Sequence, residues 1–224
     1  TTLTTILVIR PDRLGDVVLS TPVYESIKKS FPHLLLSVVV SRSNVPILID
    51  NPNIDKIIPF ELKSIGATIK QLRNTKFDVA FTLNKKFSAI ASILSLISKA
   101  KYKISYAHDE TAWLYDIRLP LDNQLRHESL NNLELLNYAG LPLSSKTPRL
   151  YFNKDEEIKV TSMLSTLRKY PERPLVLIKP GTRIAQWGWK ADNFKVVAEK
   201  LSSLKQAEVL FICACQIRQA MRII

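Results

Sequence analysis

The sequence has few of the residues that build disulfide frameworks and metal sites. It contains two cysteines, Cys213 and Cys215, in a C-x-C spacing, and three scattered histidines. This pattern matches neither a disulfide-stapled secreted domain nor a zinc-ligand set. We therefore expect no metal site, and a reducing, cytoplasmic environment fits best.

Long apolar runs are also missing. The longest candidate, residues 87–97, alternates with serines and falls short of the roughly 20 residues that span a bilayer. The apolar run at residues 6–9 is too short for a signal peptide and is followed at once by charges. We therefore expect neither a membrane span nor a secretory signal.

Acidic residues are scarce beside basic ones. The chain has 20 Asp and Glu against 32 Lys and Arg, a net charge of +12 and a pI near 9.7. Such a balance fits nucleic acid, an anionic membrane surface or phosphorylated substrates as partners. A lysine-rich proteome with solvated charged faces would give the same numbers. No nucleic-acid-binding motif accompanies the charge, so we expect no nucleic-acid partner.

What is present is enough for a folded core, because 46% of the 224 residues are apolar. Residues 6–22, ILVIRPDRLGDVVLSTP, organise the first half of the chain. Their apolar start predicts a strand that is buried on both faces. A charged loop follows, and its single glycine, Gly15, permits a close approach of the backbone. Thr21 and Pro22 then predict a helix start with Thr21 as the N-cap.

Strands and helices alternate beyond this unit. Further strands are expected at residues 34–40, 54–60, 77–83 and 101–106, and helices at 63–72 and around 90–97. This alternation predicts a parallel, doubly wound α/β sheet with right-handed crossovers. Residues 107–130 are expected to be irregular. The next helix is expected to bury Leu130, Leu133, Leu136 and Tyr138 and to end at Gly140.

A second α/β unit is expected after a short linker. Asn153 and Glu156 form a plausible helix-capping pair, and strands are expected at residues 175–178 and 209–212, with a helix at 192–204 between them. The predicted organisation is an N-terminal Rossmann-like acceptor-side domain, a linker, and a partial C-terminal Rossmann-like donor-side domain. Their residues are 1–142, 143–152 and 153–224.

Three segments resemble one family. Residues 9–32, IRPDRLGDVVLSTPVYESIKKSFP, resemble the N-terminal signature of the ADP-heptose:lipopolysaccharide heptosyltransferases, glycosyltransferase family 9. Residues 126–141 look like the family's histidine–glutamate segment, which opens a Leu-rich helix. Residues 176–194 are similar to the motif that opens its C-terminal domain. The family usually has a phosphate-binding lysine where this chain has Trp187.

The resemblance implies a fold and an activity. The fold would be two Rossmann-like domains of GT-B type, the C-terminal one incomplete. The activity would be an inverting, metal-independent transfer of heptose from an ADP-sugar to the lipopolysaccharide inner core, with no cofactor besides this donor. The implied partners are the nucleotide-sugar donor, a phosphorylated lipopolysaccharide acceptor and the cytoplasmic surface of the inner membrane.

The resemblance and the positions of polar residues after the predicted strands together indicate site residues, each of which has a plainer alternative. Asp16 corresponds to the proposed general base, although an aspartate here could equally cap a helix. Four cations follow the first and fourth predicted strands, at the same edge of the sheet. They would bind a phosphorylated or carboxylated acceptor, or be ordinary solvated charges, and a histidine before a helix is often structural. The candidate acceptor residues are Arg10, Arg13, Lys85, Lys86 and His127. The candidate donor-phosphate residues, which could also form a plain surface turn, are Gly15, Gly181, Thr182, Arg183 and Lys190.

Family members continue through a Gly-rich turn after the strand expected at residues 209–212. Here that strand runs into residues 213–224, which contain no glycine and do not resemble the family. We expect a C-terminally truncated chain that binds its donor poorly. Three other readings stay open: a different sugar or acceptor within the family, a non-catalytic fragment or subunit that needs a second chain, and a nucleic-acid module resting on charge alone.

Overall fold

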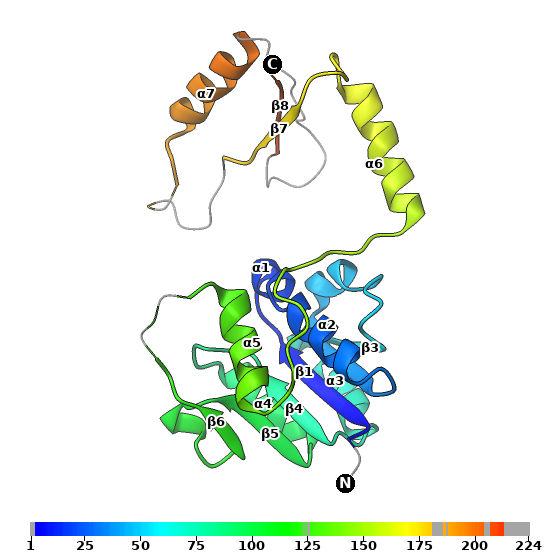
Figure 1. Ribbon diagram of the computed structural model, residues 1–224, viewed down its shortest axis with the longest axis vertical. Helices are drawn as coiled ribbons and strands as arrows, with labels where there is room; N and C mark the ends of the chain where they lie inside the picture. Colours follow the sequence, from blue (N-terminus) through cyan, green and yellow to red (C-terminus); the bar gives the residue numbers. More distant parts are fainter. Residues whose placement is uncertain are drawn as a thin grey trace. The chain divides into compact units, whose positions relative to one another are not determined.

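The computed structural model describes residues 3–122, 124, 126–180, 186, 188–203 and 207–212. The chain forms two compact units, Thr1–Phe152 and Asn153–Ile224 (Figure 1). No described helix is long and apolar enough to cross a lipid bilayer.

Unit 1 is built on a sheet of six parallel strands in the order β3-β2-β1-β4-β5-β6. The strands are β1 (Thr5–Arg10), β2 (Leu35–Ser41), β3 (Lys56–Phe60), β4 (Val79–Thr82), β5 (Tyr102–Tyr106) and β6 (Ile117–Leu119). The expected parallel α/β sheet is thus confirmed. The strand order reverses between β1 and β4, and open parallel sheets bind ligands at the carboxyl ends of strands at such a reversal.

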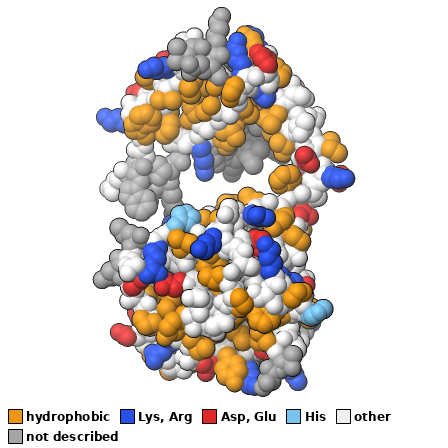
Figure 2. All heavy atoms as spheres, viewed as in Figure 1, with side chains coloured by type: hydrophobic (Ala, Val, Ile, Leu, Met, Phe, Trp, Pro, Cys, Tyr) orange, Lys and Arg blue, Asp and Glu red, His pale blue; other side chains and the backbone are white. Residues whose placement is uncertain are grey.

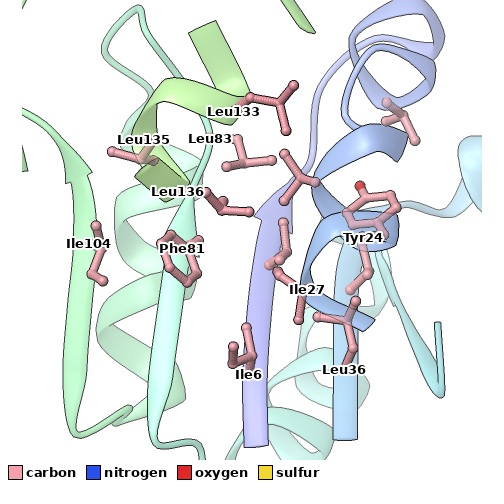
Figure 3. Close-up of a cluster of buried hydrophobic side chains, with 14 of the residues drawn as sticks. Ile6, Tyr24, Ile27, Leu36, Phe81, Leu83, Ile104, Leu133, Leu135 and Leu136 are labelled. Atoms are coloured by element: carbon pink, nitrogen blue, oxygen red, sulfur yellow. The ribbon is translucent and has the colours of Figure 1, made fainter. Parts of the chain in front are cut away.

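Helices cover both faces of this sheet (Figure 1). They are α1 (Leu14–Val18), α2 (Thr21–Ser30), α3 (Ile65–Arg73), α4 (Ala89–Ser98) and α5 (Glu128–Tyr138), with 3₁₀ turns η1 (Arg42–Ile47), η2 (Leu62–Ser64) and η3 (Asp109–Thr111). One core lies between the sheet and helices α2 and α5, and its buried side chains include Tyr24, Phe81 and Leu136 (Figure 3). A second core lies under α3 and α4.

The C-terminal end of α5 follows its sequence prediction. Gly140 has a φ of +80°, a conformation that favours glycine. The backbone N–H of Gly140 donates to Asn137 O at 2.9 Å, and that of Leu141 donates to Leu136 O at 3.0 Å. These two bonds form a Schellman motif, so the predicted glycine stop is confirmed.

Residues beyond α5 lie against unit 1. The backbone N–H groups of Ser144 and Ser145 donate to Ser26 Oγ at 3.2 and 3.3 Å. The N–H of Arg149 donates to Thr21 Oγ1 at 3.0 Å. Much of the segment that sequence assigns to the linker is therefore hydrogen-bonded to α2.

Unit 2 contains α6 (Lys154–Leu167), β7 (Leu175–Ile178), α7 (Ala191–Ser203) and β8 (Glu208–Phe211). Strands β7 and β8 pair in parallel, and their described core is the small cluster of Ile178, Ala198 and Val209. The predicted helix cap is confirmed, because the side chain of Asn153 accepts a hydrogen bond from the backbone N–H of Glu156 at 2.9 Å.

Four predicted details are wrong. Thr21 is the first residue of α2, not its N-cap, and its hydroxyl donates to Val18 O at 2.8 Å. The charged loop contains a short helix, α1, and the segment expected to be irregular contains β6. Leu130 and Tyr138 are exposed rather than buried, because α5 buries the polar residues Asn131 and Asn132 instead.

Candidate active site

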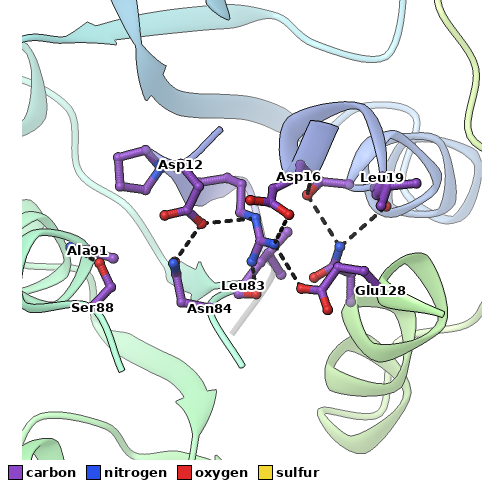
Figure 4. A network of polar contacts seen from close by, with 12 residues as sticks. Asp12, Asp16, Leu19, Leu83, Asn84, Ser88, Ala91 and Glu128 are labelled. Atoms are coloured by element: carbon purple, nitrogen blue, oxygen red, sulfur yellow. Dashed lines mark hydrogen bonds and ion pairs between the residues drawn. The ribbon is translucent and has the colours of Figure 1, made fainter. Parts of the chain in front are cut away.

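Four segments bring polar side chains together at the carboxyl edge of the sheet in unit 1 (Figure 4). Arg10 ends β1, and Asp12 and Asp16 follow it in the next loop and in α1. Asn84 follows β4, and Glu128 is the first residue of α5. This edge lies where the strand order reverses, so the polar cluster occupies the position expected for a ligand site.

Arg10 is the centre of this cluster, and its side chain is only 3% exposed. Its Nη2 lies 2.8 Å from Glu128 Oε1 and 3.7 Å from Asp16 Oδ1, and its Nε lies 3.2 Å from Asp12 Oδ2. Its Nη1 donates to Leu83 O. A buried guanidinium needs partners of this kind, because an unpaired buried charge is strongly destabilising. One cation thus holds three carboxylates in fixed positions.

Asp16 combines this anchoring with access to solvent. Its carboxylate keeps 35% of its exposure while one oxygen faces Arg10. Its backbone carbonyl accepts a hydrogen bond from Ser20 Oγ at 2.8 Å, which ties α1 to the start of α2. No side-chain hydrogen bond caps α1, whose N-cap residue is Arg13, and Asp16 lies in the first turn of this helix. The carboxylate is therefore oriented, accessible and not engaged as the N-cap.

Helix α5 supports the cluster with buried amides. Asn131 Nδ2 donates to Glu128 Oε2 at 3.2 Å, and the carbonyl of Asn131 accepts from the hydroxyl of Tyr106 at 2.6 Å. Asn132 Nδ2 donates to Leu19 O at 3.3 Å. These bonds fix Glu128 on one side of Arg10 and the end of α1 on the other. They also explain why α5 turns two asparagines inward.

Asp12 is the carboxylate next to Arg10 Nε, and its side chain is 24% exposed. Burial raises its pKa, and the nearby charge of Asp16 acts in the same direction. Arg10 and the hydrogen bond from Asn84 Nδ2 to Asp12 Oδ2, at 2.6 Å, act against this rise without cancelling it. The folded state therefore favours protonated Asp12 more than the unfolded chain does.

This shift predicts how an Asp12→Asn variant should respond to pH. Because the folded pKa is raised, the stability that Asp12 contributes is complete below the unfolded pKa and is lost as pH rises through the folded pKa. The variant should therefore gain stability relative to the parent as pH rises from about 3 to about 7. Urea unfolding at several pH values measures the difference.

Asp78→Asn provides a control of opposite sign. Hydrogen bonds from Thr4 and Thr5 lower the pKa of Asp78, so its contribution to stability is present above the unfolded pKa and is lost as pH falls through the folded pKa. The control variant should lose stability relative to the parent as pH rises. A common pH trend in both variants would contradict the assignment for Asp12.

The candidate acceptor residues fall into two groups. Arg10 is buried in the cluster, and Lys85 is half-buried, with its Nζ 2.9 Å from Asp122 Oδ1. Arg13, Lys86 and His127 are exposed at the same edge. His127 is the N-cap residue of α5, and its Nδ1 lies 2.7 Å from Ser129 Oγ. The four cations that the sequence predicts at this edge therefore differ in state. Arg10 is buried among carboxylates, Lys85 is paired with Asp122, and the other two are exposed.

The candidate donor residues lie in both units. Gly15 is exposed in α1, and a Cβ added there would meet nothing within 4 Å. Lys190 is exposed just before α7. Gly181, Thr182 and Arg183 lie outside the described residues. Two other motif residues do pack together, since the rings of Trp189 and Phe194 meet edge-on with centroids 5.3 Å apart.

A comparison with protein families decides the relationship. The model described as "Glycosyltransferase family 9 (heptosyltransferase)" matches residues 65–222, more than half of the chain. The chain belongs to glycosyltransferase family 9. In the part of this family member that the structure describes, no group of three or more His, Cys, Asp or Glu side chains is arranged to hold a metal ion.

Individual relatives agree with the family assignment. The chain is 27% identical over 198 residues to the lipopolysaccharide core heptosyltransferase OpsX of Haemophilus influenzae, covering 85% of this chain and 55% of the relative. Its fold is similar to that of a family 9 glycosyl transferase from Veillonella parvula, with a TM-score of 0.79 and 21% identity over 93% of this chain and 62% of the other.

A further solved structure is that of the E. coli heptosyltransferase WaaC with ADP-2-deoxy-2-fluoro heptose. It gives a TM-score of 0.68 at 13% identity, covering 92% of this chain and 68% of the other. At this identity the likeness concerns the fold. The chain spans 55 to 62% of the length of the relatives that it matches over most of its own length.

Sequence reasoning missed the supporting residues of the site. Asp12, Asn84, Asn131 and Asn132 were not assigned there, and Glu128 was considered only beside His127. A usable signal existed for two of them, since Asn131 and Asn132 interrupt the apolar pattern of α5 and are nearly fully buried. For Asp12 the only signal was its place in the loop after β1.

Proposed function

We propose that this family 9 chain takes part in transferring a heptose from an ADP-sugar to the inner core of lipopolysaccharide, with Asp16 as the general base. The observation that carries the proposal is the accessible Asp16 carboxylate, held 3.7 Å from buried Arg10 at the carboxyl edge of a parallel sheet. The chemistry requires a fixed carboxylate that can reach an acceptor hydroxyl.

The proposed reaction is a single displacement. Asp16 accepts the proton of the acceptor hydroxyl while that oxygen attacks C1 of the heptose from the side opposite the diphosphate. The C1–O bond to ADP breaks, and ADP leaves with the electron pair, so the configuration at C1 inverts. Arg10 acts as a positioning residue, because its buried guanidinium faces the Asp16 carboxylate, and Glu128 acts through Arg10, which it holds at 2.8 Å. This route uses no metal ion.

The exposed cations at the same edge would hold the acceptor. Arg13 and Lys86 have no ion-pair partner among the described side chains, so they are available to phosphate groups of an inner-core acceptor. Lys85 and His127 would add contacts at the rim. Arg10 would contribute through Asp16, since its own donors face protein carboxylates and the carbonyl of Leu83.

Unit 2 would supply the donor side, in an arrangement of two Rossmann-like domains of GT-B type with a partial second domain. The proposed division remains residues 1–142, 143–152 and 153–224. Gly15 in unit 1 and Gly181, Thr182, Arg183 and Lys190 in unit 2 would meet the donor phosphates. The proposed setting is the cytoplasmic face of the inner membrane, with no nucleic acid as partner.

A second function is favoured by one observation. The described part of unit 2 has a two-stranded sheet, whereas unit 1 has six strands. Two strands with a small core give little independent stability. In this reading the chain is a subunit or a non-catalytic fragment that binds acceptor but needs a second chain to bind the donor.

Calorimetric titration separates the two functions. The chain is titrated with ADP, with ADP-heptose and with a phosphorylated inner-core acceptor, and transfer is assayed with donor and acceptor together. Donor binding with transfer supports the enzyme, whereas acceptor binding with weak or absent ADP binding supports the subunit. Binding of neither ligand, or tighter binding of oligonucleotides, would overturn the proposal.

A further inference from the structure

Helix α4 is an apolar helix at the surface of unit 1. Its ten residues, AIASILSLIS, include no charged side chain. It buries Ala91 and Leu94 against the sheet, yet Ile90, Ile93 and Leu96 on its other side are 41 to 50% exposed. A surface helix ordinarily turns its polar residues outward, whereas α4 buries Ser95 and Ser98 and exposes aliphatic side chains. The outer side of α4 is therefore a surface that suits contact with something apolar.

Other large apolar side chains are exposed in segments that precede or contact α4. Phe87, just before α4, is 45% exposed, and its ring lies 6.0 Å from that of His108. Trp113 is 73% exposed. It lies two residues before Tyr115, whose hydroxyl donates to Ser92 Oγ in α4 at 3.4 Å. The exposed indole therefore belongs to a segment that contacts α4.

The same part of the chain is strongly basic. Residues 62–108 contain nine Lys and Arg and one acidic residue, Asp78, which gives 9 − 1 = +8 of the chain's +12. Asp78 is occupied by hydrogen bonds from Thr4 and Thr5. The nearby cations Lys63, Lys70, Arg73, Lys86 and Lys99 are exposed. None of these five forms an ion pair with any described side chain.

The opposite face of unit 1 differs. The side covered by α2 and α5, turned to the viewer in Figure 2, shows acidic and basic side chains interspersed. Some of these charges pair within the protein, as Lys29 does with Glu25 at 2.7 Å and Arg126 does with Glu134. The segment that contains α3 and α4 thus carries five exposed cations that form no ion pair with a described side chain.

We propose that the α3–α4 surface, formed by the exposed residues of α3 and α4 with Phe87 and Trp113, docks onto an anionic lipid bilayer. Isoleucine, leucine and phenylalanine side chains would enter the acyl boundary, and the indole would lie at the headgroup level. The unpaired lysines and arginines would meet lipid phosphates, each adding attraction that salt screens. This surface combines the two signals that stable peripheral binding requires.

The charge pattern decides against a second copy of the chain as the occupant. A two-fold dimer through α4 would bring the unpaired cations of one copy near those of the other, and such like-charge contacts oppose association. Nucleic acid would match the cations but would leave five aliphatic and aromatic side chains without an apolar partner. An anionic bilayer matches both features.

The position of the surface also suits the proposed reaction, and this point alone rests on the proposed function. Phe87 lies three residues after Asn84, whose side chain donates to Asp12 in the site cluster. A docked α3–α4 surface would therefore place the site close to the lipid in which an acceptor is anchored. Membrane docking itself is measured without any sugar substrate, so its outcome is independent of transfer.

Vesicle sedimentation tests the docking of the whole chain. The protein should pellet with vesicles of phosphatidylcholine that contain roughly 30% phosphatidylglycerol, an anionic content that gives a strong negative surface potential. It should not pellet with vesicles of pure phosphatidylcholine. Raising the salt from about 0.1 M to about 0.5 M should release it, because the Debye length falls well below 10 Å. Equal pelleting with both kinds of vesicle, or with neither, would overturn the proposal.

Charge substitutions locate the surface. The triple variant Lys70→Gln, Arg73→Gln and Lys99→Gln should bind anionic vesicles at least about tenfold more weakly. A matched triple variant removes the same charge from exposed positions elsewhere: Lys146→Gln, Lys154→Gln and Lys159→Gln. The affinity of the matched variant for anionic vesicles should stay within about threefold of the parent's, because only the long-range attraction of the net charge to the vesicle surface is reduced. Equal losses in both variants would mean that net charge, not this surface, drives binding.

Apolar substitutions test insertion. Ile90→Ser with Ile93→Ser should weaken anionic-vesicle binding by about tenfold or more, because two large side chains no longer enter the bilayer. Leu130→Ser with Ile158→Ser, exposed elsewhere, should leave it unchanged. Light scattering of each variant, coupled to size exclusion, reports oligomeric state. A dimer that the α4 variant abolishes, without vesicle binding by the parent, would identify a second copy as the occupant and overturn the lipid assignment.

Discussion

Replacing Asp16 with asparagine is expected to abolish most sugar transfer while leaving the protein folded. General-base catalysis typically contributes about 10²- to 10⁴-fold, and the rate should fall by that order. The fold should persist, because Asp16 is 35% exposed and Arg10 keeps Asp12 and Glu128 as partners at 3.2 and 2.8 Å. Initial rates of heptose transfer are measured with this chain alone or, if it needs a second chain to bind the donor, with the two chains together.

The pattern of kinetic constants separates a base from a binding residue. Loss of a base should lower kcat, with donor and acceptor affinities changed little. Asp109→Asn is a matched control, since Asp109 is exposed in η3 and makes no ion pair with a described side chain. Turnover of Asp16→Asn within a fewfold of the parent, at unchanged donor affinity, would remove Asp16 from the base role.

Most of the fold follows from simple patterns in the sequence. The apolar runs of β1 and β7 are short and uninterrupted, and that of β2 is broken only by Ser37, which is typical of strands in a parallel sheet. Strand β6 was not predicted, because it has only three residues, Ile117, Arg118 and Leu119. That is too short for a strand pattern to be recognised in the sequence. It is defined by pairing with β5 rather than by its own composition.

The buried face of α5 could not be predicted from helical periodicity. Helical periodicity assumes that apolar residues point inward, whereas α5 buries Asn131 and Asn132. Their burial is favourable because their side-chain amides find partners from elsewhere in the chain: Lys85 Nζ donates to Asn131 Oδ1, and Asn132 Nδ2 donates to the carbonyl of Leu19. No local pattern contains that information, so Leu130 and Tyr138 were assigned to the wrong side.

The sequence predicts where the candidate site lies, but not how its side chains are buried and paired. The strand, charged loop and Gly15–Asp16 pair marked the correct sheet edge. The state of Arg10 could not be predicted, because its closest carboxylate, Glu128, is 118 positions away in the chain. A loop arginine is ordinarily solvated, and only the fold turns this one inward.

Arg10→Gln is expected to cause the largest loss of stability of any single change at the site. Removing one partner of a buried ion pair typically costs about 3–5 kcal/mol, because the remaining charge stays desolvated. Here three carboxylates would lose their shared cation, and glutamine offers them at most two amide protons. Chemical denaturation measures the free energy of unfolding. Arg42→Gln is the matched control, since Arg42 is 59% exposed and pairs with Glu61 at 2.9 Å.

The exposed pair should contribute no more than about 1 kcal/mol, so the control should stay near the parent. The loss in Arg10→Gln should be greater at neutral pH than near pH 4, because Arg10 lowers the pKa of Asp12 and the carboxylates can take up protons once it is gone. Adding Glu128→Gln should restore part of the stability, since it removes one of the uncompensated charges. Equal losses at positions 10 and 42, or no recovery in the double variant, would show that Arg10 is not the counterion that holds this site together.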